Sequence, residues 1–205
     1  ISKDPAFVAA KKLVESFRNE INPVYANFKA EEESLMKKYV KSRMELFPDK
    51  NYWPDANSTL RVAYGKSEGS TPRDGVKYTF YTTLDGIMAK HNSGHEDFDM
   101  PEKLKDFHAK KDYGKYGNDG ELRICFTGSN HTTGGNSGSP VLNAYGELIG
   151  LNFDRSWEST MSDLHYDADI CRNITVSINY VLFVIDKYAG AGHLVKEMTL
   201  IKDKP

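Results

Sequence analysis

The sequence has no long apolar run and no strong excess of charge of either sign. Its longest apolar segments, such as 181–185, are far shorter than the roughly 20 residues that a helix needs to cross a membrane. The formal net charge is only -2 at pH 7, so the chain produces no long-range field that would attract nucleic acid or an anionic membrane. We therefore expect a soluble protein that binds neither.

Cysteine is also scarce, because Cys125 and Cys171 are the two residues of this type. They permit one disulfide but do not require it, and a free thiol in the strand-like segment 123–126 packs as a small apolar side chain. We favour free thiols, and a bridge stays open as the alternative. A basic segment followed by an apolar leader is missing too, and the sequence starts at Ile1 rather than Met. We expect a fragment of a longer protein.

The first 50 residues have the pattern of two helices. Asp4-Pro5 and Asn22-Pro23 are typical helix starts, since a capping side chain precedes a proline in each. Apolar residues recur at helical spacing after the first start, and Pro48 should end the second helix. We predict a helical hairpin over residues 1–50 as the first domain.

From Thr59 onward, β-branched and aromatic runs alternate with glycine and asparagine, which predicts strands. We expect a fold that is mainly β with flanking helices, in which residues 51–205 form a sheet or barrel. The segment 101–111 has a helix start and is expected to be a surface insertion. The tail from 178 to 188 is too apolar for a free helix, so we expect it to pack back on the sheet.

One motif carries chemistry, the run 135–140 with the sequence Gly-Asn-Ser-Gly-Ser-Pro. A serine hydroxyl attacks a carbonyl only when a tight turn presents it and backbone amides stabilise the oxyanion. Gly135 allows the turn in which its own amide and that of Ser137 point at one spot. The strand, turn and returning strand that follow over 139–151 complete a pattern typical of chymotrypsin-like serine peptidases. Ser137 is the predicted nucleophile.

A catalytic base is not evident from the sequence. The histidines upstream of Ser137 are His91, His95, His108 and His131, and none has the small-residue context that precedes a catalytic histidine of this clan. We interpret all four as surface or structural histidines. His91 and His95 have the spacing of a metal pair on a helix, but the Ser-Gly between them breaks such a helix, so we predict no metal site.

Four segments together resemble the C-terminal portion of the bacterial dipeptidyl peptidases of the chymotrypsin-like clan, most closely their branch specific for acidic residues. These segments are 133–141, 150–158, 172–176 and 180–187. The resemblance implies a C-terminal chymotrypsin-like β-barrel, preceded by the end of a helical domain. Family members are longer chains whose catalytic histidine and aspartate lie in an N-terminal barrel, which implies that this chain is inactive alone.

The resemblance also assigns roles to individual residues. Ser137 would be the nucleophile, and the amides of Gly135 and Ser137 the oxyanion hole. Asp154 would bind the free α-ammonium group of a peptide substrate, and Arg155 the carboxylate of an Asp or Glu before the cut. The family further implies no cofactor, a homodimer of the complete enzyme, and a periplasmic or cell-surface location in a Gram-negative bacterium.

Asp154 and Arg155 are adjacent, which is a difficulty in a regular strand. Neighbouring side chains of a strand point to opposite faces, so both can serve one pocket only if the segment bends or bulges after Phe153. A carboxylate anchor for an ammonium group is physically sensible, because a dipeptide-releasing enzyme must measure two residues, about 7 Å, from the substrate's N-terminus. The alternative is a local surface ion pair between the two residues.

Two other functions stay open at this point. A glutamyl or general serine endopeptidase of the same clan would explain residues 133–151 equally well, but neither the helical lead nor the tail 172–187. A pseudo-peptidase that serves as a binding module would need no nucleophile, and the intact turn at Ser137 argues against it.

Overall fold

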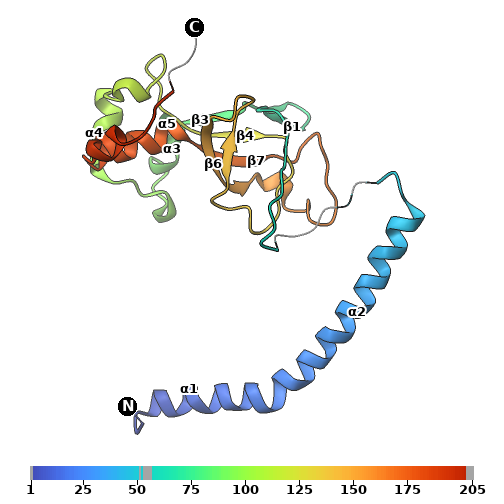
Figure 1. Cartoon of the computed structure of the whole chain (residues 1–205). Coiled ribbons are helices and arrows are strands. Elements are labelled where there is room, and N and C mark those ends of the chain that lie inside the picture. The colour runs from blue at the N-terminus through green and yellow to red at the C-terminus, as the bar shows by residue number, and fades with distance from the viewer. Residues whose placement is uncertain (1, 51, 53–56, 202–205) are drawn as a thin grey trace. The chain divides into compact units, whose positions relative to one another are not determined.

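The computed structural model describes residues 2–50, 52 and 57–201. The chain divides into two compact units, Ile1–Pro54 and Asp55–Pro205, and each is described by itself (Figure 1). Residue 51, where the predicted second domain begins, lies outside the described residues.

The first unit is one continuous helical run rather than the predicted hairpin (Figure 1). Helix α1 (Pro5–Ser16) passes through a π-helical turn, η1 (Phe17–Ile21), directly into α2 (Asn22–Leu46). The prediction took Asn22-Pro23 as a new start after a turn. Instead, the wider π-turn precedes the proline, which has no N–H to donate, and the backbone stays helical. The expected start at Asp4 is confirmed, because its carboxylate accepts hydrogen bonds from the amides of residues 6 and 7 at 2.8 and 3.1 Å.

The second unit is built on an open antiparallel sheet. Its five strands lie in the order β3-β4-β7-β6-β5, and a separate hairpin precedes them. The five are β3 (Tyr81–Thr83), β4 (Arg123–Gly128), β5 (Pro140–Leu142), β6 (Leu148–Arg155) and β7 (Asn173–Ser177), and the hairpin is β1 (Ser70–Arg73) with β2 (Val76–Tyr78). The prediction of strands with flanking helices is confirmed, but the described residues form a mixed fold of helix and antiparallel sheet rather than one that is mainly β. A closed barrel is not formed by the residues that the structure describes, because β3 and β5 are sheet edges and the hairpin pairs with itself.

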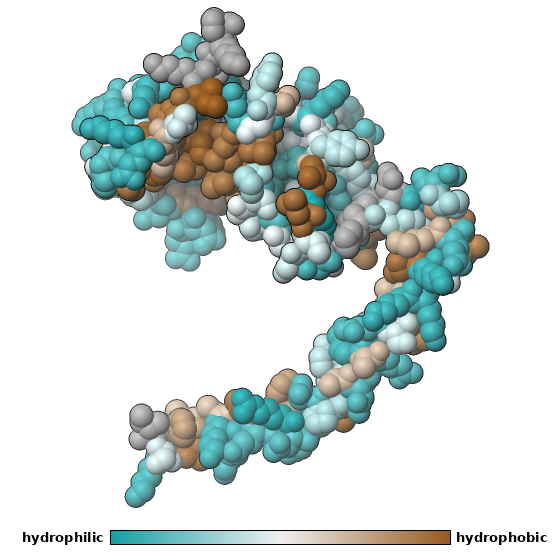
Figure 2. Space-filling model, in the orientation of Figure 1, coloured by the Kyte–Doolittle hydropathy of each residue, from teal (hydrophilic) through white to brown (hydrophobic). Residues whose placement is uncertain are grey.

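Helices gather at one end of this sheet and form the core with it. They are α3 (Leu84–His91), η2 (Glu96–Phe98), α4 (Glu102–Lys110), η3 (Gly114–Tyr116), α5 (Ile178–Phe183), η5 (Val184–Tyr188) and α6 (Gly192–Lys196). A further short helix, η4 (Trp157–Ser159), follows β6 and adds no residue to this core. Phe183 and Leu84 are completely buried, and Figure 2 shows apolar side chains gathered over α3 and α5. The tail therefore packs on the sheet as predicted.

The segment 101–111 is the exception to its prediction. It forms helix α4, but Leu104 of that helix and Met100 just before it are 8% and 5% exposed and belong to the core. From the sequence alone, a polar helix with a single apolar stripe is expected at the surface, because the pattern does not show what packs against the stripe. The insertion is therefore part of the core rather than a surface excursion.

Candidate active site

Ser137 lies on an exposed turn between β4 and β5. The amide of Asn136 donates to the carbonyl of Thr133 at 3.2 Å, while the Asn136 side chain accepts from the amide of Thr133 at 2.9 Å. Gly135 and Gly138 have φ angles of +94° and +83°, a conformation that side chains other than glycine rarely adopt. The two glycines thus fix the backbone on both sides of the serine.

The turn is tied to strand β6 by main-chain and side-chain hydrogen bonds. Gly138 donates from its amide to the carbonyl of Asn152 at 2.7 Å, and the amide of Asn152 donates to Ser139 at 2.9 Å. The side chain of Asn152 donates to the carbonyl of Asn136 at 3.2 Å and accepts from the side chain of Asn173 at 3.0 Å. Asn152 and Asn173 are 5% and 2% exposed, and buried amides paired in this way hold a turn rigidly. No pattern in the sequence indicates this pair.

Two backbone amides of the turn are available to a ligand. Within the described part of the chain, neither the amide of Gly135 nor that of Ser137 donates a hydrogen bond, and both residues are exposed. Main-chain N–H groups normally find an acceptor, either in the protein or in water. A pair left open beside a serine hydroxyl is what stabilisation of a tetrahedral oxyanion requires.

The hydroxyl of Ser137 has one partner among the described residues. Its Oγ donates to the carbonyl of Phe153 at 3.3 Å, and none of the six histidines of the chain hydrogen-bonds to it. The four upstream histidines instead have neighbours elsewhere. His91 and His95 lie 3.5 and 3.6 Å from the carboxylates of nearby aspartates, His108 is 2.5 Å from Asp85, and His131 packs on the ring of Tyr166.

Strand β6 has an irregularity of the kind that Asp154 and Arg155 would need in order to serve one pocket. Its register with β7 shifts between Asn152 and Asp154, so Phe153 is an extra residue in the ladder and forms a β-bulge. The bulge frees the carbonyl of Phe153 to face Ser137, which sequence reasoning did not foresee. Asp154 is exposed, and its carboxylate accepts the amide of Arg155 at 2.7 Å.

Arg155 does not form the ion pair with Asp154 that the alternative interpretation required. Its Nη1 lies 2.6 Å from Oδ1 of Asp163, and its Nη2 lies 3.1 Å from Oδ2. Nη1 also donates to the hydroxyl of Ser162 at 2.7 Å. The hydrogen bond with Asp163 raises the pKa of Arg155, and the same bond lowers the pKa of Asp163, so the pair is ionised at neutral pH. Sequence reasoning missed Asp163, which stands in a polar loop with no motif.

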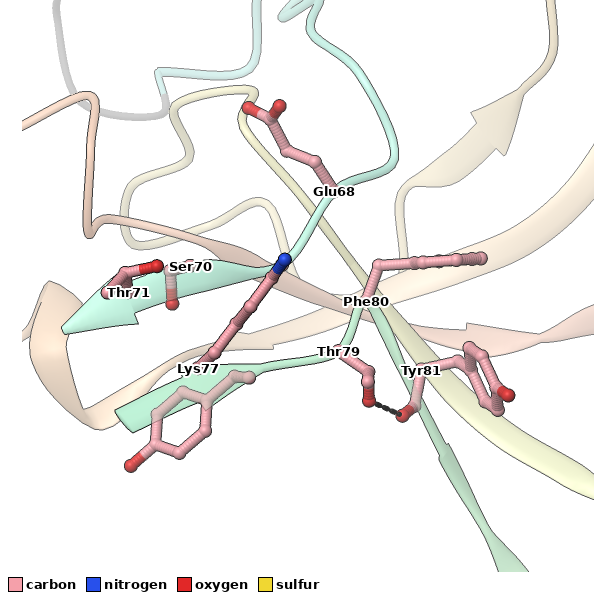
Figure 3. A pocket seen from close by; sticks show the side chains of 9 residues that line it. Glu68, Ser70, Thr71, Lys77, Thr79, Phe80 and Tyr81 are labelled. Atoms are coloured by element: carbon pink, nitrogen blue, oxygen red, sulfur yellow. Dashed lines mark hydrogen bonds between the residues drawn. The ribbon is translucent and has the colours of Figure 1, made fainter. Parts of the chain in front are cut away.

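Arg155 lies in a tightly packed environment. A cavity of about 10 Å³ lies among its neighbours, including His131, Ser162 and Arg172, and this is room for about one water molecule. A larger hollow of about 410 Å³ lies between the β1–β2 hairpin and the start of β3. Figure 3 shows Lys77 and Phe80 at its wall. None of the four predicted site residues lines it.

The remaining sequence predictions concern thiols, metals and membranes. Cys125 and Cys171 are both free thiols, and burial raises the pKa of Cys125. Across residues 2–50, 52 and 57–201, no cluster of three or more potential ligands could hold a metal ion. The same residues include no helix with the length and apolar character needed to traverse a membrane.

The sequence matches one protein family over nearly its whole length, since the family model described as Peptidase S46 covers residues 1–200. The chain is 50% identical over 204 residues to the Asp/Glu-specific dipeptidyl-peptidase of Flavobacterium psychrophilum, covering 100% of this chain and 29% of the relative. It is 43% identical to the dipeptidyl-peptidase 7 of Phocaeicola vulgatus, over 98% of this chain and 28% of that protein.

A solved structure is similar as well. The crystal structure of Porphyromonas endodontalis DPP11 in complex with the dipeptide Arg-Asp superimposes with a TM-score of 0.71 at 46% identity, covering 78% of this chain and 23% of that one. The chain thus spans less than a third of the length of these relatives.

Proposed function

Because the chain belongs to the peptidase S46 family, we propose that it is the nucleophile-bearing part of a serine dipeptidyl peptidase that releases N-terminal dipeptides with Asp or Glu at the second position. The observation that carries this proposal is the turn at Ser137, where two unused amides flank a hydroxyl that faces the bulged strand β6. Relatives at 50% and 52% identity are named Asp/Glu-specific dipeptidyl-peptidase, and the similar crystal structures hold Arg-Asp or Arg-Glu.

In the proposed reaction, Ser137 Oγ attacks the carbonyl carbon of the second substrate residue as its proton passes to a base. The amides of Gly135 and Ser137 donate to the oxygen that becomes negative. Collapse of the tetrahedral intermediate breaks the peptide bond, and the departing amine takes the proton. Water then attacks the acyl-enzyme by the same route and releases the dipeptide. The Phe153 carbonyl, outside the β6–β7 ladder, is suited to accept the substrate's amide N–H.

Asp154 and Arg155 measure and select the substrate in this proposal. The exposed carboxylate of Asp154 pairs with the substrate's α-ammonium group, and the guanidinium of Arg155 pairs with the carboxylate of the residue before the cut. The base is a histidine, oriented by an aspartate, from the N-terminal barrel of the longer protein, since no histidine of this chain hydrogen-bonds to Ser137. We accordingly expect this chain by itself to fold and to show no measurable turnover.

The resemblance supports three wider proposals about the longer protein. The open sheet of the second unit is part of a chymotrypsin-like barrel there, and the complete enzyme is a homodimer. It acts in the periplasm or at the cell surface of a Gram-negative bacterium on peptides with a free N-terminus, without a cofactor.

The test uses the complete protein and substrates that differ only in Glu or Leu at the second position. Ser137→Ala should abolish turnover without changing the unfolding midpoint. Arg155→Gly removes two charge-assisted hydrogen bonds of about 1.5 to 3 kcal/mol each, so kcat/KM for the Glu substrate should fall about 10²-fold or more, while the Leu substrate gains. Equal Glu to Leu ratios in wild type and Arg155→Gly would contradict the assignment.

A substrate with a blocked N-terminus separates this function from that of an endopeptidase. The dipeptidyl peptidase should reject it, because the blocked amine cannot pair with Asp154. Efficient cleavage of the blocked peptide would favour the glutamyl or general endopeptidase instead.

A further inference from the structure

The guanidinium of Arg155 has two edges that can each bind a carboxylate with two hydrogen bonds. One edge, formed by Nη1 and Nη2, is occupied by the two carboxylate oxygens of Asp163 at 2.6 and 3.1 Å. The other edge consists of Nε and the second N–H of Nη2. Neither of these N–H groups has an acceptor within the part of the chain that the structure describes.

The group that holds Arg155 is itself held firmly. Ser162 is 1% exposed and accepts from Nη1 at 2.7 Å, so the residue next to Asp163 is packed in place. The amide of Ser162 donates to the carbonyl of Ser159 at 2.9 Å, and the hydroxyl of Ser159 donates to the carbonyl of Arg172 at 3.1 Å. These bonds fix the loop after η4 against the start of β7. The position of the Asp163 carboxylate is therefore set by the fold.

A fixed guanidinium binds a carboxylate differently from a mobile one. An arginine side chain free in solution has many rotamers, and binding must select one of them, whereas a prearranged fork loses little freedom. The occupied edge also defines the plane and direction in which the free edge points. An incoming carboxylate then meets two parallel N–H groups in a fixed orientation, the geometry that selects an acidic side chain.

From this geometry we propose that Asp163 is the positioning residue for substrate selectivity, which holds Arg155 so that its Nε–Nη2 edge binds the substrate's acidic side chain. This inference rests on the proposed function, in which Arg155 contacts that side chain. It assigns Asp163 no contact with the substrate and no part in bond breaking.

The opposite effect is also physically possible, since the negative charge of Asp163 repels a second carboxylate. The two effects predict opposite signs for its removal. The side chain of Asp163 is 51% exposed, so water screens the repulsion, whereas the orientation of the fork is lost entirely without a partner on that edge. Loss of Asp163 should therefore weaken selectivity.

The experiment compares Asp163→Asn with wild type in the complete enzyme, on the substrate pair with Glu or Leu at the second position. We expect the ratio of kcat/KM for Glu to that for Leu to fall about tenfold, a loss typical of a group that orients a ligating residue. The change should lie in KM for the Glu substrate, with kcat and both constants for the Leu substrate unchanged. Asp163→Glu should restore part of the ratio.

Asp169→Asn is the matched control. Asp169 is an exposed carboxylate of the same loop, and its side chain has no hydrogen bond or ion pair with any described residue. The Asp169→Asn variant should keep the wild-type ratio of kcat/KM for the Glu substrate to that for the Leu substrate. The unfolding midpoints of both variants show whether either substitution acts by destabilising the fold. Equal losses of kcat/KM for the Glu and Leu substrates in Asp163→Asn would show a merely structural role and overturn the proposal.

A double-mutant cycle separates this inference from the proposed function. In an Arg155→Gly background, Asp163→Asn should leave the Glu to Leu ratio unchanged, because no guanidinium remains to be oriented. If Arg155→Gly itself leaves the ratio unchanged, the proposed function fails and this inference with it. If Arg155→Gly acts as proposed but Asp163→Asn leaves the ratio unchanged or raises it, only the role of Asp163 is refuted.

Discussion

Arg172 should be among the most destabilising positions to truncate in the second unit. It immediately precedes β7, is 7% exposed, and uses its guanidinium to join the β1 segment to the loop after η4. Its partners are all acceptors: the carbonyls of Gly69, Ala168, Cys171 and Asp169 at 2.8, 2.8, 2.7 and 3.2 Å, and the carboxylate of Glu68 at 3.5 Å.

The expected magnitude follows from these contacts. Hydrogen bonds to a charged group contribute roughly 1.5 to 3 kcal/mol each, so four of them set an upper bound of about 6 to 12 kcal/mol. Ala168 and Asp169 are exposed residues, and their carbonyls can bind water once the side chain is gone. We therefore expect Arg172→Ala to lower the free energy of unfolding by about 3 to 5 kcal/mol, which is in the range of the larger losses caused by breaking a buried hydrogen-bond network.

The assay is guanidinium chloride unfolding of the chain, followed by near-ultraviolet circular dichroism of the buried tyrosines Tyr113 and Tyr116. In thermal unfolding the same loss should lower Tm by roughly 10 °C, since each kcal/mol shifts a domain of this size by about 2 to 4 °C. Arg73→Ala, at an exposed arginine of β1, is the control and should change the free energy by less than about 0.5 kcal/mol. Equal midpoints for the two variants would refute the reasoning.

Two further predictions concern helix α3. Asp85→Asn should destabilise the chain at pH 7, because hydrogen bonds from Lys111 and His108 lower the pKa of Asp85. The Tm difference between Asp85→Asn and wild type should shrink as the pH falls below about 3.9, the pKa of an unfolded aspartate, and should vanish below the lower pKa of folded Asp85. An equal Tm difference at pH 2.5 would contradict this prediction. The same pH profile for the exposed Asp106→Asn would contradict it as well. Gly86→Ala should raise stability by about 0.5 kcal/mol, since an added methyl meets no atom within 4 Å; a lower midpoint would show that the backbone needs glycine there.

Local chemistry explains most of the sequence predictions that the structure confirms. Asp4 caps a helix because its carboxylate reaches amides two and three residues ahead. The turn around Ser137 depends on Gly135 and Gly138, whose positive φ angles are a property of glycine itself. The bulge at Phe153 meets a condition set by strand alternation, because Asp154 and Arg155 can serve one pocket only if the strand is irregular after Phe153.

The continuous helix in the first unit shows where local rules give the wrong answer. Asn22-Pro23 has the composition of a helix start, but the same residues are tolerated within a helix when a π-turn precedes the proline. Whether the chain turns and starts a new helix or continues through a π-turn depends on a small free-energy difference between two backbone conformations, which the identity of the residues does not reveal. Helix α4 is a similar case, since burial of Leu104 depends on what packs against it.

The sequence by itself determined the turn around Ser137, the strand that follows it and the family resemblance, because each depends on residues close together along the chain. The tertiary structure alone decided what Arg155 contacts. Asp163 lies eight residues further on, in a loop of no recognisable pattern, and reaches the guanidinium because Ser159 and Arg172 fix that loop against β7. Asn152 and Asn173 meet for the same reason, across two paired strands. Contacts of this kind depend on how strands pair and loops pack, and a linear pattern does not encode them.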